Sequence, residues 1–236
     1  MNANEMSYEF DLLFDKIASF SSPGYTAKEK GIFLTKAEEI LTNRYQKAEF
    51  TEKRRRDLAN LTRTQDISTA ATTQDTGKPN GTRYELPLDL MYIEAEEVTV
   101  TSSNDCFDNK RIVVVPKSED VYPIQINNPH KKPLLNGSTY DCAWRMDFYD
   151  DANGTKRVDL ITDGTFTINT YHLTYYKKPV GITPLLSGDT STTVQVDSEL
   201  NFTCHREIVE IAIRIAAGSV DPEGYQIKMN EEQINN

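Results

Sequence analysis

Cysteine is scarce in this sequence of 236 residues, which holds only Cys106, Cys142 and Cys204. The three cysteines are far apart, odd in number and without CxxC spacing, so they suggest neither a disulfide framework nor a zinc site. We therefore expect a chain of a reducing compartment that carries no structural metal.

Long apolar runs and a basic amino-terminal segment are also missing. The early residues include Glu5, Glu9 and Asp11. No run approaches the roughly 18–20 apolar residues that a helix needs to span a bilayer. The sequence predicts neither a signal peptide nor a membrane anchor.

Positive charge is outnumbered, because 26 Lys and Arg residues stand against 36 Asp and Glu residues, a formal net charge of −10. A surface with this balance is poorly suited to wrap duplex phosphates. Basic residues do gather from Lys53 to Arg56. We interpret this run as the solvated face of a helix or as the contact for a protein partner, in preference to a DNA-binding patch.

Residues that could carry catalysis are few. His130, His172 and His205 are the only histidines, and none lies in a GxSxG elbow. Cys204 and His205 are adjacent, so on a helix their side chains point in different directions. No GxxxxGK[ST] or GxGxxG motif is present to cradle a nucleotide. The sequence predicts no catalytic and no cofactor-binding residue, and hence no enzyme; a hydrolase that uses Cys204 and His205 is the weakest of three hypotheses.

One acidic cluster has the composition of a calcium loop. It consists of Asp147, Asp150 and Asp151, followed by Asn153 and Gly154. It lacks the twelve-residue spacing and the final bidentate Glu of such a loop. Because Asn-Gly accepts the positive φ values of a tight turn, we interpret the segment as a hairpin turn between two strands and expect no metal site.

Helices are predicted in the first quarter of the chain and near its end. Ser7 can cap a first helix, Thr26 and Glu29 form a capping box before a second, and Thr51 can cap a short basic third helix. A stretch after Glu199 is apolar on most sides, which indicates a helix central to the core. We expect it to pack on the amino-terminal helices, with Ile208, Ile211, Ala212 and Ile215 against Phe10, Phe14, Phe33 and Ala37.

Strands are predicted between residues 84 and 179, where β-branched and aromatic runs are bounded by Asn, Asp, Gly or Pro. Trp144 lies in one of these runs, so we expect it to be buried. The fold class is therefore predicted as α+β, with an α-helical layer from the N-terminal helices and the C-terminal helix. A mostly antiparallel, β-sandwich-like domain lies between them in the sequence.

Five segments follow from this pattern. Residues 66–83 hold almost no large apolar side chain and several breakers, so they predict a flexible linker or loop. The segments are an N-terminal helical part (1–65), the linker (66–83), a β domain (84–197), a returning C-terminal helix (198–226) and a polar tail (227–236).

Several short motifs, taken in their order along the chain, resemble one family. They are Met6–Asp11, Phe33–Ala37, Lys53–Leu58, Asn127–Pro133, Ala143–Asp147, Tyr171–Pro179 and His205–Ala217. The set is similar to the virion ring proteins, or head-to-tail adaptors, of crAss-like bacteriophages, and the closing helix is also similar to that of podovirus tail tubular adaptors. The resemblance covers most of the chain but not residues 62–82 or the tail after Gln226.

This resemblance implies a structural virion protein without catalysis. Such a protein forms a homo-oligomeric ring, twelvefold by analogy, in the connector that links portal to tail around the DNA exit channel. The implied partners are other copies of the chain, the portal protein and other ring or tail proteins, with DNA only in passage and no membrane. The implied location is the virion, after synthesis in the cytoplasm of the bacterial host. The negative net charge agrees with a channel wall that repels DNA.

A hypothesis of another class stays open beside the ring. The chain could be a tail-associated carbohydrate- or protein-binding β module with a helical appendage. A sugar-binding module exposes aromatic platforms, whereas a ring subunit needs two different side surfaces that meet on neighbouring copies.

Overall fold

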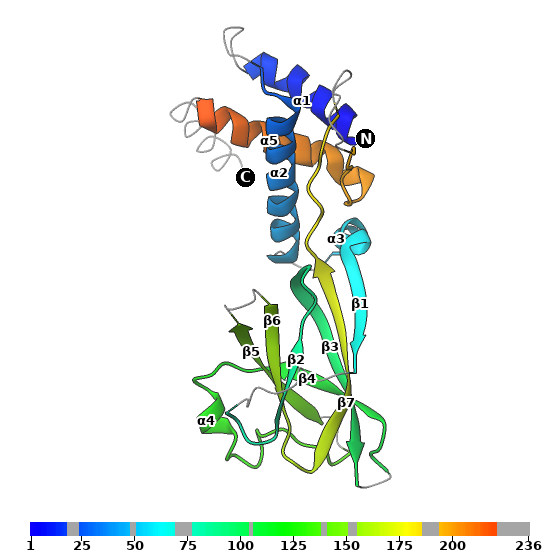
Figure 1. Ribbon diagram of the computed structural model, residues 1–236, viewed down its shortest axis with the longest axis vertical. Coiled ribbons are helices and arrows are strands. Elements are labelled where there is room, and N and C mark those ends of the chain that lie inside the picture. Colours follow the sequence, from blue (N-terminus) through cyan, green and yellow to red (C-terminus); the bar gives the residue numbers. More distant parts are fainter. Residues whose placement is uncertain are drawn as a thin grey trace. The chain divides into compact units, whose positions relative to one another are not determined.

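The computed structural model describes residues 1–17, 24–47, 51–68, 77–103, 106–137, 141–150, 155–185 and 194–220 (Figure 1). The chain divides into two compact units. Met1–Leu61 and Lys178–Asn236 form the first, here called the helical unit, and Thr62–Lys177 form the second, the β unit. The predicted α+β class is confirmed. The polar tail, residues 227–236, lies outside the described residues.

Two reciprocal caps start the first helices of the helical unit. At α1 (Ala3–Ile17) the Glu5 N–H donates to Asn2 Oδ1 at 2.8 Å and the Asn2 N–H to Glu5 Oε2 at 3.0 Å. At α2 (Ala27–Lys47) the Thr26 N–H donates to Glu29 Oε2 at 2.8 Å, which confirms the predicted capping box. Ser7 as the first cap was wrong: the Asn2 cap starts α1 earlier, and Ser7 is buried in the helix.

Three short helical segments and one further long helix complete the described part of the unit. They are α3 (Glu52–Leu58), the 3₁₀ turns η1 (Ala59–Leu61) and η2 (Phe202–Cys204), and α5 (His205–Val220). Thr51 precedes α3 as predicted, but its side chain makes no capping hydrogen bond. None of the helices in the described ranges is both long and apolar enough to cross a bilayer.

The core of the helical unit joins the two ends of the chain. The Phe10 ring of α1 stacks on the Phe33 ring of α2, with ring centroids 6.3 Å apart. Helix α5 packs against both α1 and α2 (Figure 1). Ile208, Ile211 and Ala212 are buried there, which confirms the predicted helical layer. Ile215 is only half-buried.

The β unit contains one seven-stranded sheet in the order β1-β7-β3-β4-β5-β6-β2. Its strands are β1 (Thr62–Ile67), β2 (Gly81–Glu85), β3 (Leu90–Ser102), β4 (Lys110–Pro116), β5 (Cys142–Asp150), β6 (Thr155–Ile161) and β7 (Phe166–Lys177). A parallel pair joins β4 to β5, and the other neighbours are antiparallel, as predicted for most of the domain. The parallel pair has a long connection, which includes the short helix α4 (Tyr122–Gln125).

The sheet curls, so it resembles a sandwich only in its packing. Tyr84 of β2, at one end of the strand order, has its ring centroid 5.8 Å from that of Tyr171 on β7, near the other end. The enclosed core includes Val98, Leu160 and Leu173. Trp144 is 1% exposed, which confirms its predicted burial.

The sheet starts and ends earlier than the sequence predicted. Strand β1 and the start of β2 occupy part of the expected linker, residues 66–83, and residues 69–76 lie outside the described ranges. These strands need few apolar side chains, because their backbones pair with β7 and β6. Arg83 of β2 is buried, since its guanidinium makes two bonds to Asp159, with Nε–Oδ1 at 2.7 Å and Nη2–Oδ2 at 3.0 Å.

The residues after β7 differ as well, because 178–197 belong to the helical unit and not to the β domain. The Ile182 N–H donates a hydrogen bond to Thr35 Oγ1 on α2 at 2.9 Å. Thr183 and Val196 form an isolated antiparallel β-bridge. The predicted hairpin is present as the antiparallel pair β5 and β6, whose partners Asp150 and Thr155 flank its turn. Residues 151–154 of that turn lie outside the described part of the chain.

Ile211 on α5 provides a test of the helical layer. Ile211→Asp should lower the free energy of unfolding by about 3–5 kcal/mol, because it leaves an unpaired charge in the core. Ile32→Asp on α2 is the matched control, since Ile32 is 59% exposed and Ile211 only 7%. Urea unfolding followed by circular dichroism measures both variants. Equal stability of the two variants would show that α5 does not pack as described.

Candidate functional site

Cys204 and His205, the only predicted nucleophile–base candidates, are not arranged for catalysis. The thiol is buried, which raises the pKa of Cys204 to about 11 and keeps the thiol protonated at neutral pH. The imidazole Nε2 of His205 lies 3.1 Å from the backbone oxygen of Leu200. His130 stands in an exposed turn. Cys204 therefore does not supply the reactive thiolate that the hydrolase hypothesis requires.

The third histidine takes part in an arrangement that sequence reasoning missed. His172 of β7 has Nδ1 2.6 Å from Asp66 Oδ1 on β1 and Nε2 2.8 Å from Thr99 Oγ1 on β3. A hydroxyl, an imidazole and a carboxylate in this order have the connectivity of a catalytic triad. No local sequence pattern predicts this arrangement, because it depends on the strand register that places Asp66 opposite His172.

The surroundings of this arrangement do not suit acyl transfer. Strand β7 lies between β1 and β3, and β3 lies between β7 and β4, so the backbone groups around Thr99 and His172 belong to ladders on both edges. An acyl-transfer site needs N–H donors aimed at the developing oxyanion. Asp66 is also largely exposed to solvent. The three side chains thus form a polar ladder that ties β1, β7 and β3 together.

Two buried carboxyl groups hold the turn that leads into α5. Glu38 of α2 accepts a hydrogen bond from Ser198 Oγ at 2.6 Å, and Asp57 of α3 accepts one from Thr203 Oγ1 at 2.8 Å. Burial raises the pKa of Glu38 to about 7. Among the described residues, no three His, Cys, Asp or Glu side chains group closely enough to hold a metal ion. These carboxyl groups position the turn of Ser198 and Thr203.

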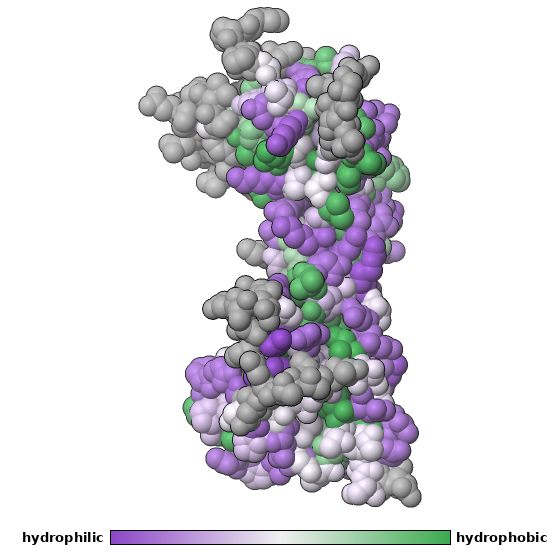
Figure 2. All heavy atoms as spheres, in the orientation of Figure 1, coloured by the Kyte–Doolittle hydropathy of each residue, from purple (hydrophilic) through white to green (hydrophobic). Residues whose placement is uncertain are grey.

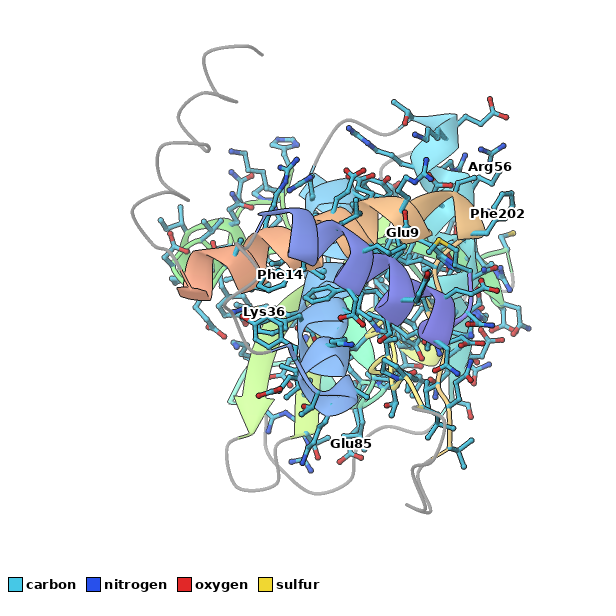
Figure 3. All side chains as sticks on the ribbon, turned by 90° about the horizontal axis from the view of Figure 1, so that it is seen from above. Glu9, Phe14, Lys36, Arg56, Glu85 and Phe202 are labelled. Atoms are coloured by element: carbon cyan, nitrogen blue, oxygen red, sulfur yellow. The ribbon has the colours of Figure 1, made fainter. Side chains whose placement is uncertain are left out.

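The basic run predicted from Lys53 to Arg56 lies on α3. The Arg54 guanidinium lies over the Tyr45 ring, 6.0 Å from its centroid. Arg55 and Arg56 are exposed, and Figure 3 labels Arg56 on the same side of the view as Phe202. The acidic cluster around Asp150 lies at the end of β5, where its side chains are outside the described part of the structure.

A groove runs along one side of α2, between that helix and the segment Gly181–Leu185. Its volume is about 850 Å³. The Gly31 position lets the segment approach, because a Cβ there would stand 2.8 Å from the Ile182 backbone oxygen. The exposed Ile32 side chain lines the groove, which we call the α2 groove. Its other lining residues are Ala27, Lys28, Thr35, Lys36, Glu39, Thr183 and Pro184.

A second apolar surface lies on α1. Tyr8 is 67% exposed and Leu12 48% exposed, and both line a shallow hollow. Glu5 and Glu9 flank them, and Glu9 Oε1 lies 3.4 Å from Arg206 Nε. We call this surface, made by Glu5, Tyr8, Glu9 and Leu12, the α1 face. Figure 2 shows apolar side chains among polar ones on the surface of the helical unit. Exposed apolar groups that cluster in this way are typical of protein–protein contacts.

Comparison with known proteins identifies relatives over nearly the whole chain. The profile of the family described as "Phage tail ring protein 3/4" matches residues 1–226. "Ring protein 4/5" of Bacteroides phage crAss001 is 32% identical over 235 residues, which cover 92% of this chain and 92% of that protein. "Ring protein 3" of the same phage is 28% identical over 233 residues, 92% of this chain and 95% of that protein.

The buried Glu38 carboxyl predicts a pH-dependent stability. Its pKa is raised from 4.5 to about 7 in the folded chain, so folding takes up a proton between these pH values. The contribution of Glu38 is therefore most favourable below pH 4.5 and decreases as pH rises to 7, by about 3 kcal/mol. Glu38→Gln keeps a neutral group that can accept from Ser198, and it should remove this decrease.

Urea unfolding between pH 4.5 and 8 measures the effect as the difference between the wild type and Glu38→Gln. Glu39→Gln is the control, because Glu39 is partly exposed and lies 2.9 Å from Lys178 Nζ. A difference between wild type and Glu38→Gln that stays constant across this range would contradict a raised pKa.

Proposed function

Because the chain belongs to the phage tail ring protein 3/4 family, we propose that it is a structural virion protein that assembles with other copies of itself into a ring. The crAss001 relatives carry ring-protein names and match over 92% of this chain. The observation that carries the proposal is the presence of two different exposed apolar surfaces on the helical unit, the α1 face and the α2 groove. A closed ring needs such a pair of surfaces on each subunit.

The finer proposal places the ring in the head-to-tail connector, where it links the portal to the tail around the channel through which DNA leaves. Twelve copies make the ring by analogy with the resembling family. Portal and further ring or tail proteins are its partners, and DNA passes without being bound. The net charge of −10 supports this, because acidic walls repel phosphates at short range. The subunit is made in the host cytoplasm and performs no catalysis.

The alternative of a carbohydrate-binding β module has less support. Trp144, the single tryptophan, is 1% exposed and cannot serve as a platform for a sugar ring. Within the described ranges, the most exposed large apolar side chains of the β unit are aliphatic, namely Leu88, Val113 and Ile124. The exposed aromatic residues Tyr8 and Phe202 lie in the helical unit instead.

Assembly of the purified chain tests the ring. We expect size-exclusion chromatography with light scattering to give a mass that is a fixed multiple of 26.8 kDa, and negative-stain electron microscopy to show closed rings with a central hole. Incubation with the portal protein of the same phage should yield a co-eluting complex. A chain that stays monomeric at high concentration, with and without portal, would refute the proposal.

Location in the particle separates the connector from the adhesin. Gold-labelled antibody against the chain should bind at the junction of head and tail, in virions opened enough to expose it. Antibody against the portal is the positive control for access to that site. Label at the far end of the tail or on its appendages would favour the β-module alternative.

A further inference from the structure

The α1 face and the α2 groove lie on different helices of the helical unit, each on the side away from the buried residues of its helix. On α2, the groove residues Lys28, Ile32 and Lys36 recur every fourth position and lie along one side of the helix. The buried residues of the same helix are offset by about half a turn from that row. They include Leu34, Ala37 and Leu41. The groove therefore opens on the side of α2 that faces away from the core.

Helix α1 is divided in the same way. Met6, Phe10 and Phe14 are buried, whereas Tyr8 and Leu12 are exposed on the opposite side. The Phe10 ring on the buried side of α1 stacks 10° from parallel on the Phe33 ring of α2, and α5 packs against both helices, so the α1 face and the α2 groove lie on the outer sides of two different helices.

The two surfaces have opposite charges around similar apolar centres. Glu5 and Glu9 flank Tyr8 and Leu12 on the α1 face, and their own ion pairs are weak surface pairs: Glu5 Oε2 lies 4.0 Å from the Met1 nitrogen, and Glu9 Oε1 lies 3.4 Å from Nε of the exposed Arg206. On the α2 groove, the Lys28 and Lys36 ammonium groups flank Ile32, and neither makes an ion pair with the described residues. Glu39, at the end of the groove, is already paired with Lys178. Complementary charges around an apolar contact favour one orientation of a partner over others.

We propose that the α1 face of one copy of the chain docks in the α2 groove of the next copy, and that this contact repeats around the ring. The proposal rests on the proposed ring function and adds the surfaces that make it. Tyr8 and Leu12 then cover Ile32, and the carboxylates of Glu5 and Glu9 meet the ammonium groups of Lys28 and Lys36.

A contact between two identical surfaces is less favourable than the contact between the α1 face and the α2 groove. Two α1 faces would bring the Glu5 and Glu9 carboxylates of both copies together, and two α2 grooves would bring the Lys28 and Lys36 ammonium groups of both copies together. A contact between two different surfaces also leaves one free surface of each kind on a dimer. The assembly can therefore grow until it closes on itself, as a ring does.

Two variants, each with one surface disabled, test the contact. Tyr8→Asp with Leu12→Asp disables the α1 face, and Ile32→Asp with Lys36→Glu disables the α2 groove. Each variant alone should be monomeric by light scattering, because it has lost one of the two surfaces that growth requires. A mixture of the two should form a one-to-one dimer and nothing larger, since only one productive contact remains.

The matched control is Leu88→Asp with Ile124→Asp, which adds two negative charges, as the α1-face variant does, on two exposed apolar residues of the β unit. This control should assemble like the wild type. Circular dichroism and thermal unfolding of all three variants confirm that they are folded. A charge exchange gives a second readout: Glu9→Lys and Lys36→Glu should each weaken assembly at least tenfold, and the two together in one chain should restore most of it.

The outcomes separate this contact from the ring function itself. A wild-type chain that forms no ring refutes the proposed function. A wild-type ring together with variants that also form rings refutes only the contact between the α1 face and the α2 groove. Folded variants that are monomeric alone and remain monomeric when mixed show that the two surfaces have other partners, and this too refutes the proposed contact.

Discussion

The pairing of β1 with β7 is the constraint on which the whole architecture depends. The chain leaves the helical unit after Leu61 and returns at Lys178. Thr62 and Tyr176, next to these two points, are register partners in the antiparallel pair. Exit and return are therefore neighbours, and the β unit is an insertion whose ends meet. Only because they meet can helices from both ends of the chain form one core.

Local signals in the sequence were enough to predict the helices and much of their packing. The Thr26–Glu29 capping box and the apolar positions of α5 depend on residues within a few turns of each other, and both are confirmed. The limits of the sheet were not predictable in this way. From its neighbours in the sequence, Arg83 is predicted to be an exposed loop residue. Its burial in the β unit requires the carboxylate of Asp159, more than seventy positions away, which pairs with its guanidinium.

The candidate functional residues, like the limits of the sheet, depend on contacts between residues that are far apart in the sequence. Sequence motifs could show that catalytic signatures are absent, but the ladder of Asp66, His172 and Thr99 exists only once three strands are in register. The α2 groove was equally hidden, because it needs Gly31 beneath a segment from the far end of the chain. For the proposed contact between copies, the informative residues are exposed ones such as Tyr8 and Ile32. Ile32 is 59% exposed, although it is an apolar residue of a helix that packs in the core of the helical unit.

The helical unit is built from both ends of the chain, so it is completed only late in synthesis. The ribosome makes α1 and α2 first, then the entire β unit, and only then the segment Gly181–Leu185 and α5. The β unit can fold while the chain is still being extended, since domains fold as units during synthesis. Helices α1 and α2 must wait for α5 to cover their apolar sides, and one wall of the α2 groove does not exist before then. Nascent chains therefore lack a complete α2 groove until the segment Gly181–Leu185 and α5 have been made.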